Sequence, residues 1–333
     1  MAKRLIQLQF GVNFHAEGIY KNFKPPQSTA FYPDFVAEEL RAALASYTGV
    51  PPEMVVCGHG SDELVDVFIR LHFLLNPQLI VAEVPPNYYQ YRNYAQRLGL
   101  RVVSLEVDRK DLRPQLFLDA GCTPENSILM LDSPANPSGE ITSKEQFIEL
   151  LEAGYHVFAD EAYFEFHQQT VIDLVSQYER LVVSRTLSKI AAMAGSRIGY
   201  IIAQPQVAEQ FRKHKLFFNI SVDSQARALF ALKHMPEFQQ RLVRMRQVKE
   251  VTAQRLRKVE GYKLFPSLDM YTIFAPLHMP TKKLHGYLGD NHGILTYLFE
   301  RYKGESAIRA TVGKLEDMKQ LIEALKTAQA EVS

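Results

Sequence analysis

Residues 181–203 read LVVSRTLSKIAAMAGSRIGYIIA, and this stretch decides the fold. Two nearly all-apolar segments, Leu181–Ser184 and Ile198–Ala203, enclose a short polar and small-residue segment. Such short apolar runs are typical of strands that are buried on both faces of a sheet. The stretch therefore predicts two buried strands joined by a turn that carries polar side chains.

A lysine, Lys189, lies in that turn between the two predicted strands. It follows the hydroxyl residues Thr186 and Ser188, and Arg197 comes eight residues later. Most single lysines only face solvent. Ligands of an open parallel sheet, however, bind at the carboxyl ends of its strands, so this turn is a candidate site.

The same alternation of strand and helix extends upstream. Further strands are predicted at Met54–Cys57, Leu79–Val84, Arg101–Val107, Ser127–Asp132 and His156–Asp160, with helices at Ser61–Phe73 and Tyr88–Leu98 between them. Asp34 can cap an earlier helix that Gly49 ends, and Thr142 with Glu145 has the spacing of a capping box. The fold class is therefore α/β, with a mostly parallel sheet between helices.

The pattern changes after about residue 207. Helical periodicity continues to Val259 and includes a basic run that we interpret as a solvated helix face, formed by Arg241, Arg244, Arg246 and Lys249. Strands near Met270–Ala275 and Ala307–Val312 and a closing helix from Leu315 then predict a small α+β unit. We expect a large domain at 30–235 and a small domain formed by 1–29 and 236–333.

The composition excludes several classes of protein. The 333 residues are 47% hydrophobic and 23% charged, with a net charge of +1, as in ordinary globular proteins. The sequence contains no run of five like charges, which disfavours nucleic acid as the main partner. Cys57 and Cys122 form neither a zinc motif nor a disulfide framework, and no apolar run approaches the ~20 residues that a membrane helix needs. We expect a cytoplasmic protein without a metal centre.

Two more places after predicted strands carry polar residues. Gly58-His59-Gly60-Ser61-Asp62-Glu63 is a glycine turn into a helix N-terminus, where free N–H groups suit a phosphate, although such turns are usually only turns. Asp160 ends a buried strand, where an unpaired charge is expensive, so a cation is expected to meet it.

Taken in order, these features resemble a known family. The chain carries, in sequence, Gly58–Glu63, the tyrosine cluster 88–91, Asn136-Pro137-Ser138-Gly139, Asp160-Glu161-Ala162-Tyr163 and Thr186-Leu187-Ser188-Lys189 with Arg197. Over about residues 30–315 this order resembles the fold type I pyridoxal-phosphate (PLP) enzymes and, among them, the histidinol-phosphate aminotransferase-like group. Chance is a poor explanation for six features in this order, with Arg197 counted as the sixth.

The resemblance implies a PLP-dependent aminotransferase of amino-acid biosynthesis and a role for each matching residue. Lys189 would form the Schiff base with the cofactor and then move a proton, and Asp160 would pair with the pyridinium nitrogen. Asn136 and Tyr163 would bind the phenolic oxygen, and Tyr88 would stack on the ring. The phosphate would be held by the backbone at Ser61 and Asp62 together with Thr186, Ser188 and Arg197.

The resemblance also implies partners. Tyr32, in Phe31-Tyr32-Pro33-Asp34, matches a tyrosine that reaches the phosphate of the neighbouring subunit, so a homodimer is implied. Arg309 matches the arginine that binds the α-carboxylate of the substrate. The substrates would be an amino acid and a 2-oxo acid.

The chain departs from the group in its substrate site. Where the group has G-I-x-x-R, with an arginine that helps bind a substrate phosphate, this chain reads Gly293-Ile294-Leu295-Thr296-Tyr297. Near the N-terminus, Gly11-Val12-Asn13-Phe14-His15 stands where the group shows N-E-N-P, which lines the substrate site. We therefore predict an altered substrate-phosphate site that involves Asn13 and Tyr297, and a preference for apolar or aromatic amino acids.

Three alternatives stay open to different degrees. A PLP decarboxylase resembling threonine-phosphate decarboxylase would carry the same motifs. A non-catalytic cofactor-binding or regulatory protein on this fold is disfavoured by the presence of Lys189 and by the lack of an appended DNA-binding segment. A nucleotide-binding Rossmann protein would need a third glycine, but Leu64 and Val65 stand there.

Overall fold

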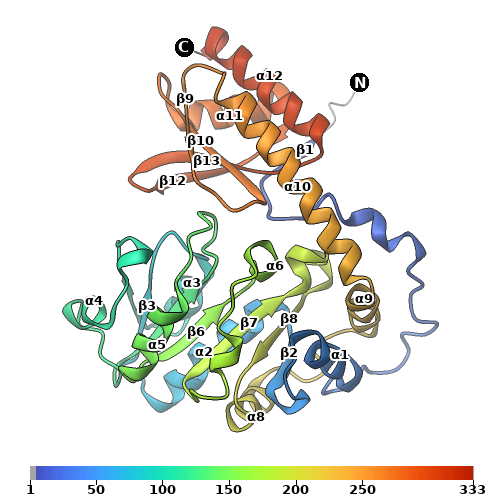
Figure 1. The fold of residues 1–333 in the computed structure, drawn as a ribbon, viewed down its shortest axis with the longest axis vertical. Helices are drawn as coiled ribbons and strands as arrows, with labels where there is room; N and C mark the ends of the chain where they lie inside the picture. The colour runs from blue at the N-terminus through green and yellow to red at the C-terminus, as the bar shows by residue number, and fades with distance from the viewer. Residues whose placement is uncertain (1–4, 333) are drawn as a thin grey trace. The chain divides into compact units, whose positions relative to one another are not determined.

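The computed structural model describes residues 5–332 (Figure 1). Within these residues the chain divides into two compact units. The large unit comprises residues 20–136 and 140–235, and the small unit comprises residues 5–19, 137–139 and 236–332.

The large unit is built on a seven-stranded sheet with the order β2-β8-β7-β6-β5-β3-β4. Its strands are β2 (Val55–His59), β3 (Ile80–Glu83), β4 (Arg101–Ser104), β5 (Ser127–Asp132), β6 (His156–Asp160), β7 (Leu181–Thr186) and β8 (Ile198–Ile202). Only β8 runs against its neighbours, and the other pairs are parallel. The prediction of a mostly parallel sheet is confirmed.

Helices connect and cover these strands. They are α1 (Glu38–Thr48), α2 (Gly60–Leu75), α3 (Gln90–Arg97), α4 (Pro114–Asp119), α5 (Lys144–Glu152), α6 (Phe164–His167), α7 (Leu187–Ile190), α8 (Pro205–His214) and α9 (Val222–Lys233), with 3-10 turns at Glu17–Asn22, Pro52–Met54, Arg109–Asp111, Ile172–Leu174 and Ala194–Ser196.

Two predicted helix caps are shifted along the chain. Asp34 lies four residues before α1, and its carboxylate accepts hydrogen bonds from the N–H groups of Val36 and Glu38. The capping box at α5 is formed by Ser143 and Gln146, one residue after the predicted pair. Both predicted helices exist. At α1 the Asp34 carboxylate accepts from the first helical N–H, whereas at α5 the capping pair lies one residue later than predicted.

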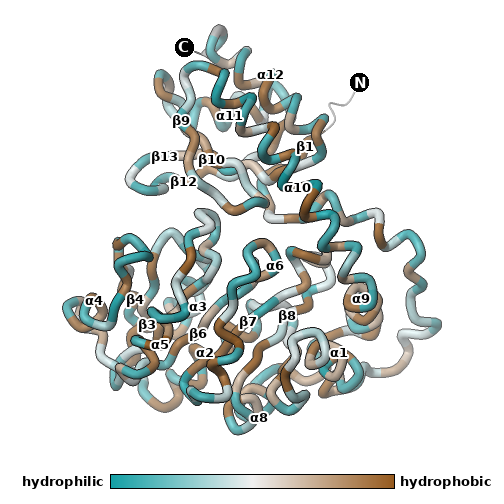
Figure 2. Tube along the Cα trace, viewed as in Figure 1, coloured by the Kyte–Doolittle hydropathy of each residue, from teal (hydrophilic) through white to brown (hydrophobic). Residues whose placement is uncertain are grey.

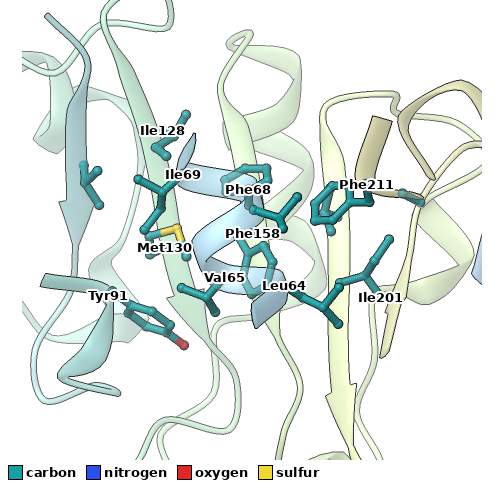
Figure 3. Packing of buried hydrophobic residues seen from close by; sticks show 14 of the residues in the cluster. Leu64, Val65, Phe68, Ile69, Tyr91, Ile128, Met130, Phe158, Ile201 and Phe211 are labelled. Carbon is teal, nitrogen blue, oxygen red and sulfur yellow. The ribbon is translucent and has the colours of Figure 1, made fainter. Parts of the chain in front are cut away.

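One hydrophobic cluster fixes α2 against the sheet. Leu64, Val65, Phe68 and Ile69 of α2 pack on Ile128 and Met130 of β5, Phe158 of β6 and Ile201 of β8 (Figure 3). The tube in Figure 2 is brown along parts of α2 and of the sheet. Because side chains alternate across a strand, Asp132, Asp160 and Thr186 lie on this same face, at the carboxyl ends of their strands.

The small unit has a four-stranded antiparallel sheet with the order β12-β13-β10-β9. Its elements are α10 (Met235–Leu256), β9 (Tyr262–Phe265), β10 (Tyr271–Pro276), α11 (Thr281–His292), β12 (Tyr297–Tyr302), β13 (Glu305–Thr311) and α12 (Leu315–Val332), and β1 (Ile6–Gln7) pairs with β11 (Ile294–Leu295). The strands β10 and β13 and the closing helix were predicted, whereas β9, α11 and β12 were not.

The basic run on α10 is only partly a solvated face. Arg246 donates to the carboxylate of Asp269 at 2.6 Å, and the Lys249 ammonium donates to the carbonyl of Leu268 at 2.8 Å. These two cations therefore tie α10 to the loop before β10.

Both cysteines are free and buried, Cys57 in β2 and Cys122 before β5. Burial raises the pKa of the Cys57 thiol to about 12 and raises that of Cys122 as well. Among residues 5–332, no helix is long and apolar enough to cross a membrane, and no group of three or more His, Cys, Asp or Glu is placed to hold a metal ion.

Candidate active site

A pocket lies at the carboxyl edge of the large sheet. Its walls are formed by Ser61, Asp62, Tyr88, Asp132, Asn136, Asp160, Ala162, Tyr163, Thr186, Ser188, Lys189, Ala194 and Arg197. These residues come from stretches that are far apart in the sequence, and the ends of the parallel strands bring them together. Every residue assigned to cofactor contact within one subunit lies in this pocket.

The first turn of α2 forms one end of the pocket, and two glycines allow its close packing. Gly60 has a positive φ of 72°, and a Cβ atom there would lie 2.4 Å from the Nη2 atom of Arg197. A Cβ atom on Gly199 of β8 would lie 2.2 Å from the backbone nitrogen of Ser61. The glycines thus let the Arg197 guanidinium and β8 approach a helix N-terminus, a place where anions bind.

A chain of charged contacts crosses this end of the pocket. Arg197 donates to one carboxylate oxygen of Asp62 at 2.6 Å, and the Tyr88 hydroxyl donates to the other at 2.7 Å. The Asp62 carboxylate is therefore engaged by Arg197 and Tyr88.

Lys189 lies in the short helix α7, whose first turn is tightly capped. The Thr186 hydroxyl accepts from the N–H of Ser188 and donates to the carbonyl of Ile198 at 2.8 Å. The Lys189 ammonium lies 5.6 Å from the ring centroid of Tyr163, which is itself buried. The hydroxyls beside the lysine thus hold its turn as well as lining the pocket.

Asp160 is a buried carboxylate that has no ion pair among residues 5–332. Its oxygens accept from the Tyr91 hydroxyl at 2.7 Å and from the N–H of Ala162 at 3.0 Å. Figure 3 shows Tyr91 at the edge of the apolar cluster. The pKa of Asp160 is raised to about 7, chiefly by burial and in part by the nearby charge of Asp132, while the hydrogen bond from Tyr91 acts to lower it.

Sequence reasoning missed three residues of this edge: Tyr91, Asp132 and Arg109. Tyr91 was only one of a tyrosine cluster, and Asp132 only the end of a strand. Arg109 forms a buried ion pair of 2.6 Å with Asp132. A charged residue at the end of an apolar strand was the one available signal for Asp132, and nothing near Arg109 in the sequence pointed to this contact.

Tyr32 does not line this pocket. Its side chain is 83% exposed, and its ring stacks on Phe218 with the centroids 4.9 Å apart. Phe31, Leu216 and Phe217 are also largely exposed. Together these five residues form an exposed aromatic patch.

Asn13, Tyr297 and Arg309 belong to the small unit. Arg309 on β13 pairs in register with Tyr297 on β12. Its guanidinium carbon lies 4.5, 4.7 and 5.7 Å from the ring centroids of Tyr271, Tyr297 and Phe299, and it donates to the carbonyl of Gln9 at 3.0 Å. Asn13 is buried, and its amide oxygen accepts from the N–H of His15.

Comparison with known proteins gives this arrangement a family. Residues 16–325 match the model of aminotransferase class I and II. The chain is 31% identical to a histidinol-phosphate aminotransferase of Dehalococcoides mccartyi over 97% of this chain and 90% of that protein, and 32% identical to one of Roseiflexus castenholzii over 90% and 81%.

Solved structures share the fold at lower identity. The histidinol-phosphate aminotransferase of Sinorhizobium meliloti, in complex with pyridoxal-5'-phosphate, superposes with a TM-score of 0.83 at 22% identity, covering 99% of this chain and 92% of that one. The L-threonine-O-3-phosphate decarboxylase of Porphyromonas gingivalis superposes with a TM-score of 0.82 at 18% identity, covering 98% and 100%. The predicted fold type I architecture, a large domain with a mostly parallel sheet plus a small α+β domain, is therefore confirmed. From its sequence and its fold, the chain belongs to the aminotransferase class I and II family of PLP-dependent enzymes and is histidinol-phosphate aminotransferase-like within it.

Proposed function

We propose that this chain is a homodimeric aminotransferase that moves an amino group between an amino acid and a 2-oxo acid, with an altered site for a substrate phosphate. One observation carries the proposal: Asp160, buried and without an ion pair among the described residues, shares one pocket with Lys189 and Arg197. A buried carboxylate without a cation is costly. Asp160 would meet that cation in the protonated pyridine nitrogen of PLP.

The rest of the pocket also fits PLP. The helix N-terminus at Ser61 and Asp62, the hydroxyls of Thr186 and Ser188 and the Arg197 guanidinium form an anion site for its phosphate. The Asn136 amide and the Tyr163 hydroxyl would bind its phenolic oxygen, and the Tyr88 ring would stack on it. When bound, PLP acts as an electron sink for charge that develops at the substrate Cα.

The residues of the chain then have separate tasks. Lys189 would hold the cofactor covalently and, once released, carry a proton to and from the substrate Cα. Asp160 would keep the pyridine nitrogen protonated. The Tyr91 hydroxyl, donating to Asp160 at 2.7 Å, would hold that carboxylate in place.

Arg309 would bind the substrate carboxylate by paired hydrogen bonds. The rings of Tyr271, Tyr297 and Phe299 around it support a preference for apolar or aromatic donors, because aromatic rings offer apolar area and no positive charge for a phosphate. Asn13 would complete the substrate site.

The exposed aromatic patch supports the homodimer. Large exposed apolar patches mark protein–protein contacts, and this one contains Tyr32, which would reach the phosphate site of the partner subunit. The domain limits of 30–235, and of 1–29 with 236–333, are part of the proposal. The change of unit between residues 235 and 236 supports the boundary at the end of the large domain.

An amino-donor screen on the purified protein tests the proposal. Aromatic or aliphatic amino acids should exceed histidinol phosphate in kcat/KM, with formation of the 2-oxo acid. Decarboxylation is the alternative to be distinguished, so the same reactions are assayed for carbon dioxide. Release of carbon dioxide without oxo acid would replace aminotransfer by decarboxylation, and histidinol phosphate ranking first would refute the altered phosphate site.

A further inference from the structure

Two aspartates end neighbouring strands at the pocket, and they are held differently. Asp132 of β5 pairs in register with Asp160 of β6, and both are buried. Asp132 has an ion pair with Arg109 at 2.6 Å, whereas Asp160 has none among residues 5–332. At this edge of the sheet, the carboxylate of Asp132 is therefore neutralised by Arg109, and that of Asp160 is left for a ligand.

Arg109 does more than neutralise Asp132. It is 2% exposed, and its guanidinium also donates to the carbonyl of Asp132 at 2.6 Å and to that of Val84 at 2.8 Å. Val84 follows β3, at the start of the loop that leads to Tyr88. Arg109 thus ties the end of β5 to the loop that carries a pocket residue.

Asp132 in turn contacts the backbone of two pocket residues. One of its oxygens accepts from the backbone N–H of Tyr88 at 3.1 Å and from that of Asn136 at 2.9 Å. Both residues line the pocket. A single carboxylate oxygen therefore fixes the backbone beneath two proposed cofactor contacts from different loops.

We propose that the buried Arg109–Asp132 pair is a positioning pair that sets Tyr88 and Asn136 against the cofactor. Its purpose is geometric, because a buried ion pair adds little net stability compared with well-packed apolar side chains. The proposal rests on the assignment of this pocket to PLP.

The chain offers a matched control in the pair Arg185–Glu161. It too is buried, with a distance of 2.8 Å, and Glu161 directly follows β6. Its carboxylate accepts from the Thr170 hydroxyl and the Val171 N–H, and it does not line the pocket. Breaking it removes a comparable buried pair from the same edge of the sheet.

The experiment compares Asp132→Asn and Asp132→Ala with Glu161→Gln. For each purified protein we would measure thermal unfolding without cofactor, the Kd for PLP by titration, and the visible circular dichroism of the bound cofactor. All three variants should unfold at a lower temperature than the wild-type protein. Only the Asp132 variants should bind PLP about tenfold more weakly or worse and lose dichroism, because the two N–H groups lose the carboxylate that accepts from them and Arg109 loses its ion-pair partner. Asp132→Asn, which keeps an acceptor oxygen, should lose less than Asp132→Ala.

The outcomes separate the two proposals. If wild-type protein binds no PLP, the proposed function fails. The other decisive outcome is that wild-type protein binds PLP, and that Asp132→Asn unfolds at a lower temperature than wild type but matches Glu161→Gln in Kd and dichroism. The pair is then merely structural and the positioning proposal is refuted. Should Asp132→Ala fail to fold, the comparison of Asp132→Asn with Glu161→Gln still decides.

Discussion

Charged side chains are held differently in two regions of the molecule. The two regions are the carboxyl edge of the large sheet and the surroundings of Arg309 in the small sheet. At the large sheet, charged side chains hold one another, as in Arg109–Asp132 and Arg197–Asp62. In the small sheet, the Arg309 guanidinium lies among three aromatic rings. The first arrangement fixes positions through short polar contacts, whereas the second surrounds a cation with apolar area.

This difference indicates where chemistry and selectivity reside. The network at the large sheet fits a cofactor whose atoms must be held in one geometry. The rings around Arg309 fit substrates that share a carboxylate and differ in their side chains. Substitutions at the large sheet should therefore lower turnover for every substrate, while substitutions near Arg309 should change the ranking of substrates.

The largest effect is expected at Lys189. Lys189→Arg should lower kcat on the order of 10³-fold, because it removes both covalent attachment and the proton carrier. In the wild-type protein, borohydride reduction followed by peptide mapping should place the cofactor on Lys189. Lys215 is the matched control, since it is a buried lysine of the same unit. An adduct on Lys215 would overturn the assignment of roles.

The second largest effect on turnover is expected at Asp160. Asp160→Asn should still bind PLP but lose on the order of 10²-fold in kcat with every donor, because the pyridine nitrogen loses its carboxylate partner. Glu165→Gln controls for burial alone. Glu165 is also buried, and burial raises its pKa to about 7, but it contacts Tyr47 and does not line the pocket. Near-normal turnover in Asp160→Asn would make Asp160 a structural residue.

The same residue should make the stability of the cofactor-free protein depend on pH. The folded pKa of Asp160 is raised to about 7, against about 3.9 in an unfolded chain. Between pH 4 and 7 the unfolded chain therefore releases a proton that the folded chain keeps, so the free energy of unfolding falls as pH rises. Relative to wild type, Asp160→Asn should gain about 3 kcal/mol from pH 4.5 to pH 7.5 in urea unfolding. A difference that stays constant with pH would contradict this.

The smallest effect, and the one that tests the small sheet, is expected at Tyr297. Tyr297→Arg should raise kcat/KM for histidinol phosphate by about tenfold and lower it for aromatic donors, because a guanidinium replaces a ring. Arg301→Ala, on the same strand, should leave the wild-type ranking unchanged. If histidinol phosphate already ranks first and Arg301→Ala removes that activity, Arg301 supplies the missing charge and the comparison between the two regions fails.

Much of the large unit could be predicted because its signals are local. The strands are short apolar runs, and their polar residues follow directly after them, as Asp160 follows the buried part of β6. The motif residues lie together because parallel strands end at one edge. The roles assigned to them remain predictions.

What sequence reasoning missed depends on contacts between distant residues. Arg109 and Asp132 are separated by 22 residues, and only the folded chain shows that they pair. The strand β12 contains exposed and charged residues and has an irregular register with β13, so it lacks a clear two-residue alternation. Lys249 looked solvated because its carbonyl partner lies on a loop that no helical periodicity includes.

The burial of both cysteines makes this chain a convenient starting point for site-specific labelling. The thiolate is the form that reacts with maleimides, and both native thiols are enclosed and have raised pKa values. A single cysteine introduced at an exposed position outside the aromatic patch, such as that of Lys110, would therefore be the main reactive thiol without removal of Cys57 or Cys122. A fluorophore attached there would report subunit association directly, at dilutions where chromatography no longer detects the protein.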